Sequence, residues 1–150
     1  MAYADHTSVS ALRSRNEIEE TLCRYHATDF TYRMGRDVVT ILFVMEGRVV
    51  KLSIHTPDAA GRTVTKYRRT REMNPAEQQQ WCDQETRRRW RSLALVVKAK
   101  LEAVASGIAM FDDEFLAYTV AKKNGETIGD ILRPQLAEFI SGARLPMLTA

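Results

Sequence analysis

Nine basic side chains near the middle of the sequence have the residue types and the spacing that suit contact with phosphate groups. The guanidinium group of arginine is planar and offers paired donors that match the geometry of a phosphate. Each phosphate that such a side chain neutralises releases counterions, so the affinity grows with the number of contacts. We therefore predict a nucleic-acid-binding surface made of these residues: Arg62, Lys66, Arg68, Arg69, Arg71, Arg87, Arg88, Arg89 and Arg91.

The charge of the chain is concentrated in the segment that holds these residues. The 150 residues carry a net charge of only +3, but residues 62–100 hold 11 basic and 4 acidic side chains and sum to +7. Residues 1–61 sum to −1 and residues 101–150 sum to −3. A segment polarised in this way steers a polyanion towards one face. We expect contacts to the nucleic-acid backbone without base reading, and therefore steep salt dependence with little sequence preference.

The arginine run also has an ordinary structural interpretation. At 100° per residue along a helix, Arg87 and Arg91 share one face, and the helix surface includes Asp83 and Glu85 as partners. Ion pairs of this kind are common on helices and contribute little energy. Both interpretations stay open. The nucleic-acid interpretation predicts that alanine at residues 87–89 abolishes binding and leaves the fold intact.

Other groups of reactive side chains give no physical case for an enzyme. Asp112, Asp113 and Glu114 are adjacent, so their carboxylates diverge on one helix, whereas two-metal chemistry needs carboxylates from separate elements. Their place at a predicted helix start is explained by the helix dipole. The three histidines are scattered, and the sequence contains no phosphate-binding or dinucleotide-binding glycine motif. We expect no catalytic residue, no metal and no cofactor.

The composition is that of an ordinary globular domain, with 45% apolar and 27% charged residues. Cys23 and Cys82 match no metal or redox spacing, and we interpret them as thiols in a reducing compartment, with a disulfide between them left open. Residues 1–15 lack the apolar core of a secretory signal. The longest apolar run, residues 38–45, is too short to cross a bilayer. We expect a soluble, cytoplasmic protein with no membrane partner.

The first predicted elements are an arm and a helix. Residues 1–14 are polar and are expected to form a flexible N-terminal arm. Ser14 and Glu17 have the spacing of a capping box. The apolar stripe that follows predicts an amphipathic helix over residues 15–26.

Three strands and a basic loop are predicted next. Residues 30–34 alternate between apolar and polar, residues 38–45 are β-branched and aromatic, and residues 49–55 alternate again. With short turns between them, these segments predict an antiparallel meander. Residues 56–73 are interpreted as a long basic loop that is functional, mobile or both. A strand-like piece at residues 64–67 could extend the sheet as a fourth strand.

A long central helix is predicted after the basic loop. Asn74, Pro75 and Glu77 form a strong helix start, and nothing stops the helix before Gly107. Its second half carries an apolar stripe that includes Trp90, which we expect to be buried. Its first half is polar and is expected to project from the domain.

The C-terminal part is predicted to hold short helices. Residues 111–116 suit one of them, and Thr127 with Asp130 has the spacing of a second capping box. Pro134 interrupts the apolar stripe that follows, so the last helix either kinks or begins at Arg133.

These elements predict an α+β fold with a single domain over residues 15–150. It contains a small antiparallel meander of three to four strands, packed with an N-terminal helix, one long central helix and a C-terminal helix. The predicted basic loop at residues 56–73 extends from this domain.

Several stretches spread over the chain form a familiar pattern. They cover residues 15–19, 47–49, 90–108, 111–116, 124–129, 141–142 and 145–146. Together they resemble a small, mostly uncharacterised protein family encoded by tailed bacteriophages and prophages. The resemblance implies an accessory phage protein in the host cell, in the context of DNA replication, recombination or host defence. The resemblance assigns a catalytic role to no residue of this sequence.

Two functions from different classes follow as expectations. The first is a phage or prophage accessory protein that binds nucleic acid non-specifically through the basic loop and helix. The alternative is a protein-binding adaptor, or an inhibitor of a host protein, that acts through the long helix and could form a homodimer. Aromatic and apolar anchors dominate protein interfaces. The residues expected in such an interface are Trp81, Leu145, Met147 and Leu148.

Overall fold

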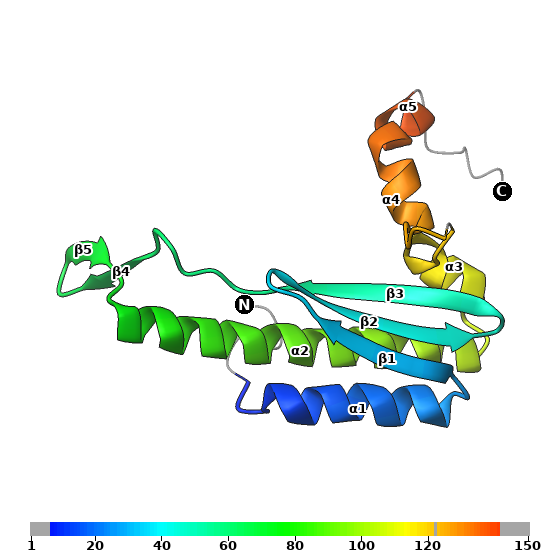
Figure 1. Ribbon diagram of the computed structural model, residues 1–150, viewed down its shortest axis with the longest axis horizontal. Coiled ribbons are helices and arrows are strands. Elements are labelled where there is room, and N and C mark those ends of the chain that lie inside the picture. The colour runs from blue at the N-terminus through cyan, green and yellow to red at the C-terminus, as the bar shows by residue number, and fades with distance from the viewer. Residues whose placement is uncertain (1–6, 122, 142–150) are drawn as a thin grey trace, which may run out of the picture.

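Two long helices lie against one face of a three-stranded antiparallel sheet (Figure 1). The computed structural model describes residues 7–121 and 123–141 of the chain. The predicted α+β class and the antiparallel meander are confirmed. The strands are β1 (Thr28–Met34), β2 (Val38–Met45) and β3 (Arg48–His55), and the helices are α1 (Ala11–Arg24) and α2 (Pro75–Ala105).

The sheet is most regular between its second and third strands. β2 and β3 pair over all eight residues of each strand. Their two-residue turn, Glu46-Gly47, has φ angles of 50° and 73°, and such a left-handed pair matches the twist of a hairpin. The pairing of β1 with β2 shifts register between Thr28 and Thr31. β2 is therefore the central strand, as its apolar sequence predicts.

The core lies between this sheet and the two helices. The ring of Phe115 meets the ring of Phe43 edge-on, with 6.0 Å between their centroids, which attaches the segment after α2 to the sheet. Trp90 is only 8% exposed and belongs to the core, as expected. The largest fully buried side chains come from every layer: Ile18, Leu22, Ile41, Phe43, Val50, Val97, Leu101 and Phe115.

Helix α1 begins four residues earlier than predicted. Ser10 adopts the extended backbone that a cap requires, and its Oγ accepts a hydrogen bond from the backbone N–H of Arg13 at 3.1 Å. Ser14 lies inside the helix and is fully buried, so the capping box predicted at Ser14 is wrong. Residues 11–14 belong to α1 and not to the predicted arm, whose residues 1–6 lie outside the described part of the chain.

The predicted basic loop contains a separate hairpin. β4 (Thr63–Lys66) and β5 (Arg69–Glu72) pair with each other and not with the main sheet, so the predicted fourth strand of the meander is wrong. The turn residues Tyr67 and Arg68 have φ angles of 51° and 64°, which again suit a two-residue hairpin. This local closure satisfies both strands without the main sheet. The irregular part of the predicted loop shrinks to residues 56–62.

The start and the end of α2 are those that the sequence predicts. The Asn74 side chain accepts from the backbone N–H of Glu77, and the Glu77 carboxylate accepts from the backbone N–H of Asn74, both at 2.9 Å. Pro75 occupies the first turn, where no backbone donor is needed. The helix ends at Ala105, before Gly107 with its φ of 73°. None of the helices among the described residues has the length and apolar character to cross a membrane.

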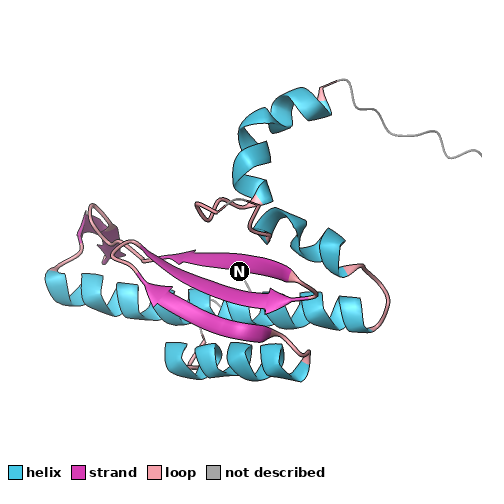
Figure 2. Cartoon of the chain, turned by 45° about the vertical axis from the view of Figure 1, so that its right-hand side comes forward, coloured by secondary structure: helices cyan, strands magenta, loops and turns pink. Residues whose placement is uncertain are grey.

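The C-terminal helices rise away from the sheet (Figures 1 and 2). The predicted capping box of Thr127 and Asp130 is confirmed. Pro134 divides the predicted last helix in two, with a 3-10 turn between the halves. The apolar stripe on these halves is exposed, with Phe139 66% exposed. The elements are α3 (Phe111–Phe115), η1 (Leu116–Tyr118), α4 (Ile128–Leu132), η2 (Arg133–Gln135) and α5 (Leu136–Ile140).

Candidate nucleic-acid interface

The tip of the β4–β5 hairpin gathers three exposed cations around an exposed aromatic ring. Lys66, Arg68 and Arg69 are all exposed, and Tyr67 between them is 90% exposed. The hairpin stands at the N-terminal end of α2, beyond the end of the main sheet (Figure 1). Residues 62–72 hold five basic side chains and one acidic one. The hairpin therefore presents a concentrated positive charge at one extremity of the molecule.

The base of the hairpin is fastened to α2 by two of the predicted phosphate-binding arginines. Arg71 donates two hydrogen bonds of 2.7 Å to the carboxylate of Glu77. This pair lowers the pKa of Glu77 from its ordinary value of 4.5 to about 2, with help from the backbone N–H of Asn74. The guanidinium group of Arg62 lies over the ring of Trp81, 3.8 Å from its centroid. Arg62 and Arg71 thus orient the hairpin.

Two of the helix arginines share one carboxylate. Glu85 accepts hydrogen bonds from Arg88 at 2.5 and 2.7 Å and from Arg89 at 2.8 Å. The hydrogen bonds from Arg88 are the largest cause that lowers the pKa of Glu85 to about 2, followed by that from Arg89. Arg89 also donates to the backbone oxygen of His55 and so ties α2 to the end of β3. These arginines are one-third exposed or less, which makes them part of the framework.

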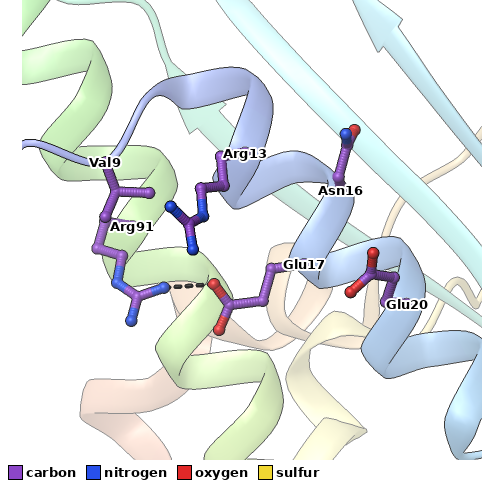
Figure 3. A pocket seen from close by; sticks show the side chains of 6 residues that line it. All are labelled: Val9, Arg13, Asn16, Glu17, Glu20 and Arg91. Carbon is purple, nitrogen blue, oxygen red and sulfur yellow. Dashed lines mark hydrogen bonds and ion pairs between the residues drawn. The ribbon is translucent and has the colours of Figure 1, made fainter.

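The other two arginines of the run are also engaged within the chain. Arg87 donates to the Gln84 side chain at 3.0 Å, and its Nε is buried. Arg91 is paired with Glu17 of α1 (Figure 3). Arg91 and Glu17 line a polar cavity of about 590 Å³ between α1 and α2, together with Arg13 and Glu20. Since two arginines face two carboxylates there, this cavity carries no surplus charge.

The structure therefore separates the predicted set into four groups. Lys66, Arg68 and Arg69 form an exposed tip, and Arg62 and Arg71 hold the hairpin base. Arg89 and Arg91 join α2 to β3 and to α1. Arg87 and Arg88 are bonded to side chains of α2 itself. Sequence reasoning did not include Tyr67 in the site. A signal was present, because two alternating four-residue segments flank a two-residue turn at Tyr67.

Of the residues expected in a protein interface, Trp81 lies in the described part of the chain. Trp81 is partly buried, and one face of its ring is covered by Arg62. Leu145, Met147 and Leu148 lie outside the described residues.

Cys23 and Cys82 are free thiols, so the disulfide that the sequence left open is not formed.

Two of the three acidic residues of α3 form ion pairs with cations on different elements. Asp112 binds Arg48 at 3.0 Å, and Glu114 binds Lys100 at 2.7 Å. Among the described residues, no three His, Cys, Asp or Glu side chains form a group that could hold a metal ion. The divergence expected for adjacent carboxylates on one helix is confirmed for these two residues.

We expect Glu85→Gln to lower the free energy of unfolding by about 1–2 kcal/mol at pH 7, because two arginines lose their charged acceptor. The pKa of Glu85 falls from 4.5 to about 2 on folding. Its contribution is therefore complete above pH 4.5 and is lost as the pH falls towards 2. Urea unfolding of both proteins at pH 7 and pH 3 measures the effect. An equal difference at the two pH values would contradict this role.

Comparison of the chain with protein-family models, with curated proteins and with solved structures finds no significant match to any of them.

Proposed function

We propose that the protein binds nucleic acid through the β4–β5 hairpin, by contacts to the phosphate backbone that do not depend on sequence. The observation that carries the proposal is the exposed tip, in which Lys66, Arg68 and Arg69 surround Tyr67. The two-stranded ribbon that carries these exposed side chains lies at one end of the molecule (Figure 1). The context proposed for this activity is that of a phage or prophage accessory protein in the cytoplasm of the host cell.

The shape of the hairpin supports this proposal. The major groove of duplex DNA is about 12 Å wide and admits a two-stranded β-ribbon. Basic side chains on the ribbon then meet the phosphates on either side of the groove. Thr65 and Thr70, which face each other across the ribbon with 2.9 Å between their hydroxyl oxygens, are exposed and add neutral donors.

The remaining arginines act at longer range in this proposal. Residues 62–100 sum to +7, and the charge of the paired arginines still contributes to the field around the hairpin. This field attracts a polyanion to the correct end of the molecule, and the tip makes the close contacts. The four helix arginines contribute attraction and not close contact, because each is bonded to an acceptor within the chain. These arginines are Arg87, Arg88, Arg89 and Arg91.

The test of the proposal is fluorescence anisotropy of labelled single-stranded and double-stranded DNA, titrated with the protein at several salt concentrations. We expect the logarithm of the association constant to fall linearly with the logarithm of salt concentration. A slope of about −3 or steeper corresponds to three or more neutralised phosphates of duplex DNA. Absence of binding at low salt would contradict the proposal, and binding that salt leaves unchanged would contradict its phosphate contacts.

We expect Tyr67→Ala to weaken binding to single-stranded DNA by about tenfold and to leave the salt dependence unchanged. The reason is that an exposed aromatic ring stacks on a base, and each such stack contributes about 1–3 kcal/mol. The fold is expected to be unaffected, because the side chain is 90% exposed. Tyr67→Phe is the matched control and should keep the affinity. Equal affinity of the alanine variant and the unchanged protein would remove Tyr67 from the interface.

A further inference from the structure

The turn of the β4–β5 hairpin has side chains that are unfavourable for its backbone. Tyr67 and Arg68 both have left-handed φ angles, of 51° and 64°. A two-residue turn of this kind favours Asn followed by Gly, and the β2–β3 turn does place Gly47 at the second position. Bulky side chains in the left-handed region are strained, and such strain is concentrated at functional sites. The fold of the turn therefore does not explain why residue 67 is a tyrosine.

The residue pair that closes the turn adds a second unfavourable feature. Lys66 lies directly opposite Arg69, so two positive side chains share one face of the ribbon, and like charges at opposite positions destabilise an antiparallel pair. The acidic residue of the ribbon, Glu72, lies three positions further along and therefore on the other face. Within the described part of the chain, Lys66, Arg68 and Arg69 form no ion pair with a carboxylate. An anionic ligand at the tip removes this repulsion.

The base of the hairpin holds the tip in place. The N–H of Met73 donates to the carbonyl of Arg62 at 2.9 Å, which closes the ribbon below its last paired residues. The ion pair of Arg71 with Glu77 joins the second strand to α2. Tyr67 is thus an exposed ring on a fixed support. A group presented in this way loses less conformational freedom on binding than a group on a flexible loop does.

The ring of Tyr67 can stack only where the face of a base is accessible. Inside a duplex, both faces of each base pair are covered by its neighbours, and the grooves present base edges alone. A side chain that enters between two base pairs must first unstack them. The cost of unstacking offsets the free energy that stacking on the ring returns. At the point where a duplex passes into a single strand, the outer face of the last base pair is free without this cost.

The duplex beside such a point provides what the cations require. Duplex DNA carries one charge per about 1.7 Å of its axis, so its phosphates form a denser array than those of a single strand. The last base pair is also held by the rest of the duplex, whereas a base of a flexible strand must be ordered before it stacks. A junction therefore offers closely spaced phosphates to Lys66, Arg68 and Arg69, and a fixed base face to Tyr67.

We propose that the hairpin binds preferentially at junctions between double-stranded and single-stranded nucleic acid. Tyr67 stacks on the last base pair, and the three cations of the tip contact the phosphates around it. The preference is for a structure and not for a sequence, because every base has a face on which a ring can stack. This inference rests on the proposed nucleic-acid binding by the hairpin, and it specifies which form of nucleic acid the hairpin prefers.

The test compares two labelled DNAs that contain the same duplex. In the first, polyether linkers close both ends of the duplex. In the second, an unpaired thymidine tail replaces one linker and creates a junction. We expect anisotropy titrations at low salt to give about tenfold tighter binding to the DNA with the junction, which is the contribution of one stacked base.

A spectroscopic signal locates the contact on the DNA. The fluorescence of 2-aminopurine depends on stacking, so this base is placed either in the last pair beside the tail or in the middle of the duplex. Saturation with the protein is expected to change the fluorescence at the junction and to leave it unchanged in the middle. Equal changes at the two positions would contradict stacking at the junction.

Tyr67→Asn is the informative variant, because it removes the ring and suits a left-handed turn better than tyrosine does. Loss of binding by this variant is therefore not a consequence of a disrupted hairpin. We expect its affinity for the junction to fall to that for the closed duplex, and its affinity for the closed duplex to stay unchanged. Tyr67→Phe should keep the preference, whereas Arg69→Gln should weaken binding to both DNAs by a similar factor.

The outcomes separate this inference from the function on which it rests. Equal affinity of the protein for the two DNAs would overturn the junction preference and leave nucleic-acid binding in place. A preference that Tyr67→Asn retains would come from the phosphates of the tail, and it would overturn the role of the ring. Absence of binding to either DNA at low salt would contradict the proposed function and this inference together.

Discussion

Replacement of Lys66, Arg68 and Arg69 by glutamine is expected to weaken binding to duplex DNA on the order of a hundredfold at low salt. The three side chains are exposed, and they are the cations at the tip of the hairpin. The slope of the logarithm of affinity against the logarithm of salt concentration should become shallower by about 3, because each lost phosphate contact removes about 0.9. Anisotropy titrations at four salt concentrations measure both quantities.

The control for this variant removes the same charge elsewhere. Arg24, Lys98 and Lys123 are exposed and lie on α1, on α2 and near the C-terminal helices. Their joint replacement by glutamine lowers the net charge by three, as in the hairpin variant. We expect a change in affinity of less than about threefold, since only the distant field is altered. Equal losses in the two triple variants would mean that overall charge, and not the hairpin, determines binding.

Phe115→Ala is expected to lower the free energy of unfolding by about 3–5 kcal/mol, the usual cost of deleting a buried ring. Phe115 is fully buried, lies edge-on to Phe43 and stacks on Phe111 with 4.8 Å between the ring centroids. Its loss leaves a cavity between the sheet and α3. Urea unfolding followed by circular dichroism measures the change.

The same substitution at Phe139 is the control. Phe139 is 66% exposed on the C-terminal helices, and a substitution at such a position usually changes stability by less than about 0.5 kcal/mol. Comparable losses for the two variants would show that the C-terminal helices contribute to the core as much as α3 does. A small loss for Phe115→Ala would contradict the role of the paired rings.

The main sheet and α2 could be predicted because their signals are local. The alternation in β3, the apolar run of β2 and the start of α2 at Asn74 each depend on neighbouring residues only. The start of α1 could not be fixed in the same way. Ser10 and Ser14 both suit a cap, and the burial of Ser14 against the rest of the domain decides between them.

The sequence identifies the basic segment that contains the candidate site, but it does not predict how the side chains of that segment are arranged in space. A count of charges identifies the basic segment at residues 62–100. It does not show that Glu17 of α1 forms an ion pair with Arg91 or that Glu85 forms ion pairs with two arginines. Such partners come from tertiary packing and from rotamers along a helix. The hairpin was missed because its strands are only four residues long and lack the apolar face of a packed strand.

Glu77 belongs to two elements at the same time, since it caps the first turn of α2 and also binds Arg71 of the hairpin. Fraying of that turn therefore releases the hairpin, and the two elements open as one local unfolding unit. A ligand that holds the hairpin in place must oppose this opening. Its binding is consequently coupled to slower amide hydrogen exchange in the first turn of α2, in residues that the ligand does not touch.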